Sequence, residues 1–140
     1  MKKIFIIIIL LSMLSCNDDT SDTNSFLPNR NVNLQLDLNL PLYSDLQIMG
    51  EYIELNENIG GIRGLIIYNT GTGFVAFDRA CPHISLQECG VMNVEGIYMV
   101  CACDDKRFQI IDGAPEDSNI PYPARAYIAT LNGNILNVRN

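Results

Sequence analysis

Two short segments near the middle of the chain carry the residues best suited to metal or redox chemistry. The first is Cys81-Pro82-His83, which contains the only histidine of the 140-residue sequence. The second is Cys101-Ala102-Cys103-Asp104. Thiolates and imidazole are soft or borderline ligands that suit iron, zinc and copper, and a carboxylate also binds iron. Because the segments are separated by about two strands' length of chain, they can converge as two loops on one metal centre.

Other kinds of chemistry remain open at this level. A zinc site could take ligands from both segments, although Cys-x-Cys is a less usual zinc spacing than Cys-x-x-Cys. Its ligands would be Cys81, His83, Cys101 and Cys103. The last two cysteines could instead form a dithiol redox pair, but no thioredoxin-like βαβ pattern surrounds them. A blue-copper site needs two histidines, and the chain has one.

The N-terminal residues have the charge and hydropathy pattern of an export signal. Lys2 and Lys3 precede an apolar stretch of about 11 residues, which is within the range of a signal peptide and too short to span a bilayer. The stretch ends in Leu14-Ser15-Cys16, which resembles the lipobox of bacterial lipoproteins. We therefore expect residues 1–15 to be removed as a signal peptide. Lipid on Cys16 would then hold the chain to the outer membrane of the cell envelope, at its periplasmic face or at the cell surface.

The composition after Cys16 limits the classes of partner. Residues 17–25 are polar and acidic, so we expect a flexible tether over residues 16–31 and a single domain over residues 32–140. Residues 16–140 hold seven basic and sixteen acidic residues, a net charge of −9. This charge, without any basic cluster, argues against nucleic acid as a partner. With Cys16 lipidated, four cysteines remain. Export leads to an oxidising compartment, where this even number fits disulfides as well as a metal site.

The elements that must position the two segments are predicted to be strands. Apolar and polar residues alternate from Val32 to Leu40, the period of a half-buried strand. Further strands are predicted at Tyr52–Leu55, Leu65–Tyr68, Phe74–Phe77, Ile97–Val100, Phe108–Ile111, Ala126–Leu131 and Ile135–Val138. Asn132-Gly133 predicts a hairpin between the last two. No long helical period follows residue 31, so an all-β sandwich or small barrel is expected.

The two cysteine segments and the strands around them resemble a Rieske iron–sulphur domain. Rieske domains carry Cys-x-His in a first loop and Cys-x-x-His in a second loop, followed by an aromatic residue. Cys81 and His83 stand at the first pair of positions, Cys101 at the second cysteine and Phe108 at the aromatic residue. The resemblance implies an antiparallel β-sandwich or small barrel with an inserted subdomain whose two loops bind a 2Fe-2S cluster.

Asp104 stands where the family has its second histidine ligand, and Asp105 and Lys106 replace the Gly-Ser that follows it. Transferred residue by residue, the resemblance implies these cluster ligands: Cys81 and Cys101 on one iron, His83 and Asp104 on the other. An anionic carboxylate stabilises the oxidised state, so the implied activity is that of a low-potential, weakly pH-dependent one-electron carrier. Its partner would be another redox protein, and the chain would have no catalytic domain of its own.

The resemblance also implies an alternative without a cluster. A subset of the family has a second cysteine in each loop, and these form a disulfide. Cys103 occupies that position here, and Cys89 lies three residues beyond its expected partner position. Without iron, the implied disulfides are Cys81–Cys101 and Cys89–Cys103, each contributing about 2–4 kcal/mol. The domain would then be a binding or structural module of the envelope.

Overall fold

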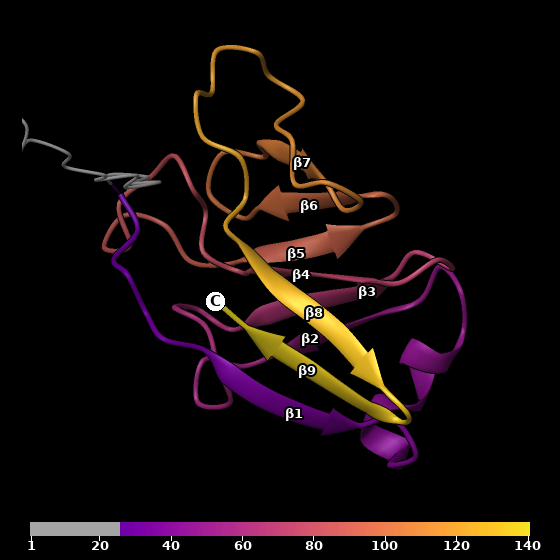
Figure 1. Cartoon of the computed structure of the whole chain (residues 1–140). Coiled ribbons are helices and arrows are strands. Elements are labelled where there is room, and N and C mark those ends of the chain that lie inside the picture. The colour runs from indigo at the N-terminus through magenta and orange to yellow at the C-terminus, as the bar shows by residue number, and fades with distance from the viewer. Residues whose placement is uncertain (1–25) are drawn as a thin grey trace, which may run out of the picture.

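The computed structural model describes residues 26–140, which fold into nine strands and one short 3₁₀ helix (Figure 1). The strands are β1 (Asn33–Asp37), β2 (Tyr52–Leu55), β3 (Leu65–Asn69), β4 (Phe74–Asp78), β5 (Met92–Glu95), β6 (Tyr98–Cys101), β7 (Arg107–Gln109), β8 (Ala126–Asn132) and β9 (Ile135–Arg139). The helix, η1, spans Pro41–Gln47. The predicted signal peptide and the lipidation of Cys16 fall outside the described residues.

The strands form two antiparallel sheets. The larger has the order β1-β9-β8-β4-β3-β2, and the smaller has the order β5-β6-β7. The smaller sheet is inserted between β4 and β8 in the chain and lies at one end of the molecule (Figure 1). The prediction of an all-β antiparallel fold with an inserted subdomain is therefore confirmed, and it is the arrangement that the Rieske resemblance implies. Within the described residues, no helix is long and apolar enough to cross a membrane.

Two hydrophobic cores pack against the two faces of the larger sheet. The first core contains buried residues from both edge strands, such as Leu36 of β1 and Ile53 of β2, because the sheet curls around them. The second core lies between this sheet and the smaller one and includes Phe77, Met99 and Phe108. The strand β3 is buried on both faces, so it contributes to both cores. This explains why its sequence is a continuous apolar run rather than an alternation.

Every predicted strand has a counterpart, but two strands end earlier than predicted. One is the strand predicted over Phe108–Ile111, which corresponds to β7 and ends at Gln109. The other is the first strand, which ends before its alternation does. The prediction of strand structure up to Leu40 was wrong, because β1 ends at Asp37. The Asp37 carboxylate accepts a hydrogen bond from the Asn39 backbone N–H at 3.0 Å, which turns the chain. Pro41, which has no N–H for a ladder, then begins η1. Leu40 is half exposed as a result.

The last hairpin was predicted correctly, but its turn lies one residue further along. Asn132 is still a strand residue and pairs with Ile135, so the turn residues are Gly133 and Asn134. Gly133 has a φ of 59°, and a glycine is favoured at the first position of such a tight hairpin turn because it has no Cβ. By contrast, β5 was not predicted at all.

The chain enters the domain beside the inserted subdomain. Leu27 is buried and packs with Ile62, Ala80 and the partly buried Leu86. Its carbonyl oxygen also accepts a hydrogen bond from Arg125 at 3.4 Å. Packing against the domain thus begins within the segment that was predicted as a tether over residues 16–31.

Candidate metal centre

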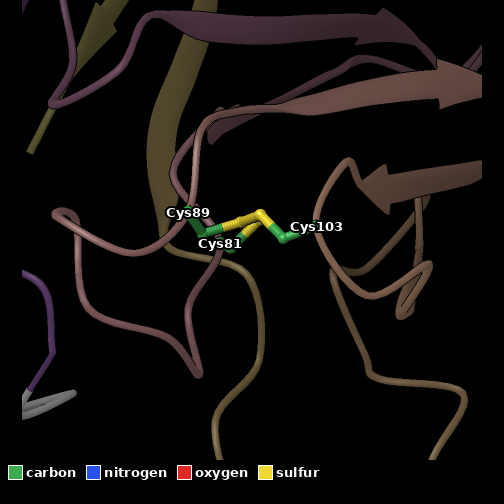
Figure 2. Close-up of side chains that lie close together, drawn as sticks. All are labelled: Cys81, Cys89 and Cys103. Carbon is green, nitrogen blue, oxygen red and sulfur yellow. A yellow bond between two sulfur atoms is a disulfide. The ribbon is translucent and has the colours of Figure 1, made fainter.

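The ends of the smaller sheet hold the two loops that carry the cysteines. The first loop joins β4 to β5 and contains Cys81 and Cys89, and the second joins β6 to β7 and contains Cys103. Cys101 is the last residue of β6. Cys81, Cys89 and Cys101 are buried in the second core, whereas Cys103 is exposed. Figure 2 shows how side chains from the two loops meet between them.

Two disulfides connect the loops, Cys81–Cys101 and Cys89–Cys103. The Cα atoms of the two pairs lie 5.8 Å and 5.7 Å apart, within the usual range for a disulfide. These are the pairings that the cluster-free interpretation implied. The two disulfides also touch, because the Sγ atoms of Cys81 and Cys89 are 3.3 Å apart. All four sulphur atoms therefore form one contiguous group.

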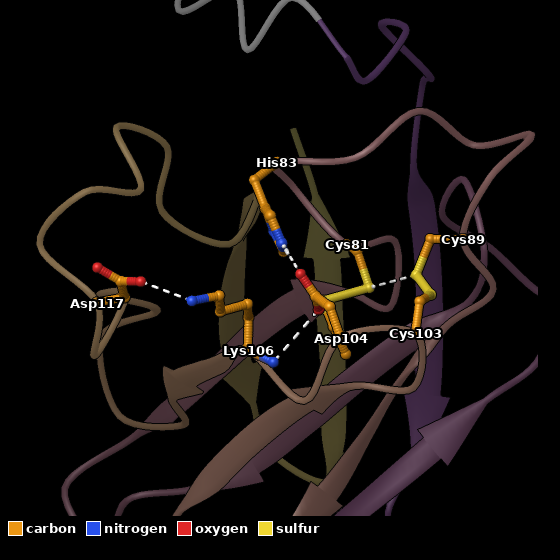
Figure 3. Close-up of polar contacts among 8 residues, drawn as sticks. Cys81, His83, Cys89, Cys103, Asp104, Lys106 and Asp117 are labelled. Carbon is orange, nitrogen blue, oxygen red and sulfur yellow. Dashed lines mark hydrogen bonds and ion pairs between the residues drawn. A yellow bond between two sulfur atoms is a disulfide. The ribbon is translucent and has the colours of Figure 1, made fainter.

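His83 and Asp104 meet directly beside this sulphur group (Figure 3). The His83 Nε2 and Asp104 Oδ2 atoms are 2.8 Å apart. One donor atom from each of His83, Asp104 and Cys101 lies within 4.8 Å of the others. The structure thus brings together the four side chains that the Rieske resemblance named as ligands. The His83 ring also lies near Phe108, with ring centroids 5.8 Å apart.

One nitrogen of His83 has an unusual environment. The Nδ1 atom is buried and has no hydrogen-bond partner among the residues that the structure describes. When Nε2–H donates to Asp104, a neutral imidazole carries its lone pair on Nδ1. A buried polar atom without a partner is unfavourable by about 1–3 kcal/mol. A ligand or a hydrogen-bond donor at His83 Nδ1 would offset this unfavourable free energy.

Asp78, at the end of β4, is the main residue of the site region that the sequence analysis missed. Its carboxylate is completely buried and accepts hydrogen bonds from the backbone N–H groups of Ile62, Arg63 and Ala80. It also accepts one from the Tyr127 hydroxyl at 2.8 Å. Because Ala80 immediately precedes Cys81, Asp78 fixes the start of the first loop. In the sequence nothing distinguishes this aspartate from the exposed ones.

Burial, together with the negative charge of Asp78, raises the pKa of the Tyr127 hydroxyl well above its ordinary value. Tyr127 therefore remains a neutral hydrogen-bond donor to Asp78 over the pH range in which proteins are normally handled.

Arg79 fixes the two ends of the first loop relative to each other. Its side chain is 10% exposed and forms an ion pair with Glu54 of β2 at 2.8 Å. It also donates hydrogen bonds to the Met92 carbonyl oxygen at 3.2 Å and to Asn93 Oδ1 at 2.9 Å. The other carboxylate oxygen of Glu54 accepts from the Val94 N–H at 2.9 Å. The larger sheet is thereby connected to β5, where the first loop ends.

The second loop turns tightly through Asp105. This residue has a φ of 57°, the only positive value at a non-glycine position within residues 26–140. Aspartate adopts this left-handed conformation more readily than most residues, so it can occupy the position where the Rieske pattern has glycine. The Asp105 N–H donates to the Cys101 carbonyl at 3.0 Å, and the Cys101 N–H donates to the Lys106 carbonyl at 2.9 Å. The second loop thus forms a compact turn with aspartate at this position.

An ion pair between Lys106 and Asp117 supports this loop and gives a pH-dependent prediction. Their Nζ and Oδ2 atoms are 2.7 Å apart. The hydrogen bond from Lys106, and those from Asn119, lower the pKa of Asp117 to about 2, and the hydrogen bond to Asp117 raises the pKa of Lys106. Asp117 therefore stabilises the fold above its unfolded pKa of about 4, and this contribution is lost as the pH falls toward 2.

We expect the variant Asp117→Asn to lower the free energy of unfolding slightly, and by a constant amount between about pH 5 and pH 9. Below about pH 4 the difference from wild type should shrink, because the wild-type carboxylate also becomes protonated. Urea unfolding of both proteins across this pH range measures the difference. A difference that grows as the pH falls would be inconsistent with the lowered pKa of Asp117.

A second prediction concerns the disulfide nearer the surface. Cys89 and Cys103 are separated by 14 residues in the chain, and closing such a loop stabilises a fold by about 3 kcal/mol. We expect the double variant Cys89→Ser/Cys103→Ser to lose about this amount in chemical unfolding of the oxidised protein. The single change Asp105→Asn serves as the matched control, because it alters the same loop without removing a covalent bond. An undiminished stability of the double variant would show that these two cysteines are not paired in solution.

Comparison with known proteins gave matches to solved structures alone. No protein-family model and no curated protein matches the sequence. The fold is similar to a structure described as a complex of reduced oxygenase and oxidised ferredoxin in carbazole 1,9a-dioxygenase, with 22% identity and a TM-score of 0.49. That match covers 76% of this chain and 93% of the other.

Two further solved structures are similar at the same level. One is the ferredoxin of carbazole 1,9a-dioxygenase from Nocardioides aromaticivorans IC177, with 20% identity, a TM-score of 0.47, and coverage of 79% of this chain and 97% of the other. The other is a putative NADH-dependent nitrite reductase small subunit from Mycobacterium tuberculosis, with 12% identity, a TM-score of 0.47, and coverage of 80% and 97%. Likenesses of this strength assign no activity, cofactor or partner to this chain.

Proposed function

We propose that this chain is a Rieske-type 2Fe-2S protein that carries single electrons, with a carboxylate in place of one histidine ligand. Cys81 and Cys101 would hold one iron, and His83 and Asp104 would hold the other. The observation that carries the proposal is the convergence of these four side chains at one point between the loops. The proposal includes anchoring to a membrane of the cell envelope by lipid on Cys16.

The donor set fits the cofactor with one change. Two thiolates are the ligands that Rieske centres place on the first iron, and imidazole suits the second. The buried Nδ1 of His83, which has no partner among the described residues, is a nitrogen whose lone pair a metal would satisfy. The Cys89–Cys103 disulfide holds the loops together through residues outside the ligand set. Reduction of Cys81–Cys101 would therefore release two ligands without separating the loops.

When bound, the cluster would accept and release one electron at a time. The residues around it control where the electron passes and how easily it is taken up. Cys81 and Cys101 are almost completely buried, whereas the side chains of His83 and Asp104 are 13% and 32% exposed. The side chains of His83 and Asp104 are therefore the part of the site that a docked redox protein would approach. The Asp104 carboxylate adds a negative charge next to the site, which favours the oxidised state and lowers the potential.

A second candidate function is favoured by the disulfides. All four cysteines within residues 26–140 are paired, and the Asp104 carboxylate partners His83 Nε2. These contacts support an iron-free domain in which the cysteines serve stability and the loops form part of a binding or structural surface. Because Cys81 and Cys101 are bonded to each other, two of the four proposed ligand positions are occupied by a covalent bond in this form.

Iron analysis of the anaerobically purified chain separates the two candidates. The cluster proposal predicts about two irons and two sulphides per chain, with a visible absorption spectrum that bleaches on reduction. The variant Cys81→Ser should lose both the iron and the visible absorption. The variant Cys89→Ser should retain the iron, because the Cys89 side chain is outside the ligand set. A colourless, iron-free wild-type sample in which mass mapping finds both disulfides would replace the first candidate with the second.

A further inference from the structure

The two disulfides differ sharply in how accessible they are to solvent. Cys103 is exposed, whereas Cys89, Cys81 and Cys101 are 5%, 2% and 0% exposed. An external thiolate must reach the sulphur atom that it attacks, so access decides which disulfide reacts first. Among residues 26–140 Cys103 is the one exposed cysteine, so we expect its sulphur to be the first that an external thiolate reaches. The Cys81–Cys101 disulfide offers no comparable point of attack.

The buried disulfide nevertheless has a neighbouring sulphur inside the protein. Cys89 Sγ lies 3.3 Å from Cys81 Sγ, the contact drawn as a dashed line between these residues in Figure 3. If Cys89 were released as a thiolate, its nearest electrophile would be Cys81 of the second disulfide. The sequence of contacts from solvent to the core is therefore Cys103, Cys89, Cys81 and Cys101.

We propose that these two disulfides form a relay for thiol–disulfide exchange, through which an external dithiol opens the buried Cys81–Cys101 bond by attacking the exposed Cys103. This activity is separate from the electron-carrier proposal, because it uses the iron-free, fully oxidised chain. The co-reactant is a dithiol, such as the Cys-x-x-Cys pair of an envelope oxidoreductase. The chain would oxidise that dithiol and be reduced by two electrons.

Each exchange step breaks one sulphur–sulphur bond and forms another. The external thiolate first bonds to Cys103 Sγ and displaces Cys89 as a thiolate. Cys89 then bonds to Cys81 Sγ and displaces Cys101 as a thiolate. The second thiol of the dithiol finally displaces Cys103 from the mixed disulfide and closes the external disulfide. The two protons of the dithiol end on Cys101 and Cys103, so electrons and atoms balance.

The product has a different connection between the loops. Cys81–Cys89 lies entirely within the first loop, and Cys101 and Cys103 become a free dithiol in the second. Both covalent links between the loops are therefore lost, although only one of the two disulfides has been reduced. The relay thus converts a two-electron reduction at the surface into release of the buried β6 cysteine.

Mass mapping of the air-purified full chain tests the relay. The protein is treated with one equivalent of dithiothreitol, quenched with acid, alkylated with N-ethylmaleimide and digested without reduction. We expect alkylated Cys101 and Cys103 together with a Cys81–Cys89 disulfide. Alkylation of Cys89 and Cys103 alone, with Cys81–Cys101 intact, would overturn the proposal, because it would show that reduction stops at the outer disulfide.

A pair of single variants tests the internal step without any reductant. In Cys103→Ser, the unpaired Cys89 thiol should attack Cys81, so that the alkylating reagent labels Cys101 and a Cys81–Cys89 disulfide is found. In the matched control Cys89→Ser, the label should lie on Cys103, with Cys81–Cys101 unchanged. Labelling of Cys89 in the first variant, with no Cys81–Cys89 disulfide, would rule out the transfer. The wild-type mapping stands independently of whether either variant folds fully.

Discussion

Replacing Asp104 by histidine is expected to raise the reduction potential of the reconstituted centre by on the order of 100 mV and to make it depend on pH. The change removes a negative charge beside the proposed site and supplies the second imidazole of the Rieske pattern. Since imidazole ligands lose protons more readily in the oxidised state, a second one increases the coupling between proton loss and electron uptake. Potentiometric titration followed by visible absorption, between about pH 6 and pH 9, measures both effects.

Two controls separate ligand identity from charge alone. Asp104→Asn removes the charge while offering no imidazole, so its potential should rise without acquiring a steeper dependence on pH. Asp105→Asn removes a neighbouring negative charge outside the ligand set and should leave the pH profile unchanged. If Asp104→His had the potential and the pH profile of wild type, Asp104 would not be a ligand of the centre.

Asp78→Ala is expected to lower the free energy of unfolding by about 3–6 kcal/mol. The side chain accepts four hydrogen bonds in a completely buried position. Its removal leaves several buried donors without partners, and each unpaired buried group is unfavourable by about 1–3 kcal/mol. Because Ala80 is one of those donors, the start of the first loop should also loosen. Chemical unfolding of the iron-free oxidised protein measures the loss directly.

The variant Tyr127→Phe provides the matched control for Asp78. It removes one of the four hydrogen bonds and keeps the packing of the ring, so a loss of about 1 kcal/mol is expected. Asp78→Asn should fall between the two, because the amide oxygen accepts hydrogen bonds while the amide nitrogen cannot. A loss for Asp78→Ala no larger than that for Tyr127→Phe would mean that the backbone contacts of Asp78 contribute little to stability.

The strands were predictable wherever their burial leaves a clear pattern of apolar residues in the sequence. The alternation of β1 and the apolar run of β3 both identified strands, and their burial explains the two patterns. The end of β1 was missed because it depends on the turn made by Asp37 and on the proline that begins η1. The short strand β5 was missed because its burial depends on packing against β6, which four residues of sequence do not reveal.

The site was predictable where a distinctive residue type and a family pattern coincide. The spacing of cysteine and histidine indicated the two loops, and the resemblance to the Rieske pattern implied the disulfide pairing. The roles of Asp78 and Arg79 were not predictable, because aspartate and arginine at a strand end are usually solvated. Their partners come from strands distant in sequence, as the contacts with Tyr127 and Glu54 show. Only the folded chain identifies them as the residues that fix the first loop.

Mössbauer spectroscopy of the anaerobically purified chain, produced with Mössbauer-active iron, tests the central proposal most directly. A centre held by Cys81 and Cys101 on one iron and by His83 and Asp104 on the other contains two chemically different irons. The oxidised protein should therefore give two quadrupole doublets of equal area, one from sulphur-ligated iron and one from iron bound by nitrogen and oxygen. A single iron environment, or a sample without iron, would contradict the proposed ligand set.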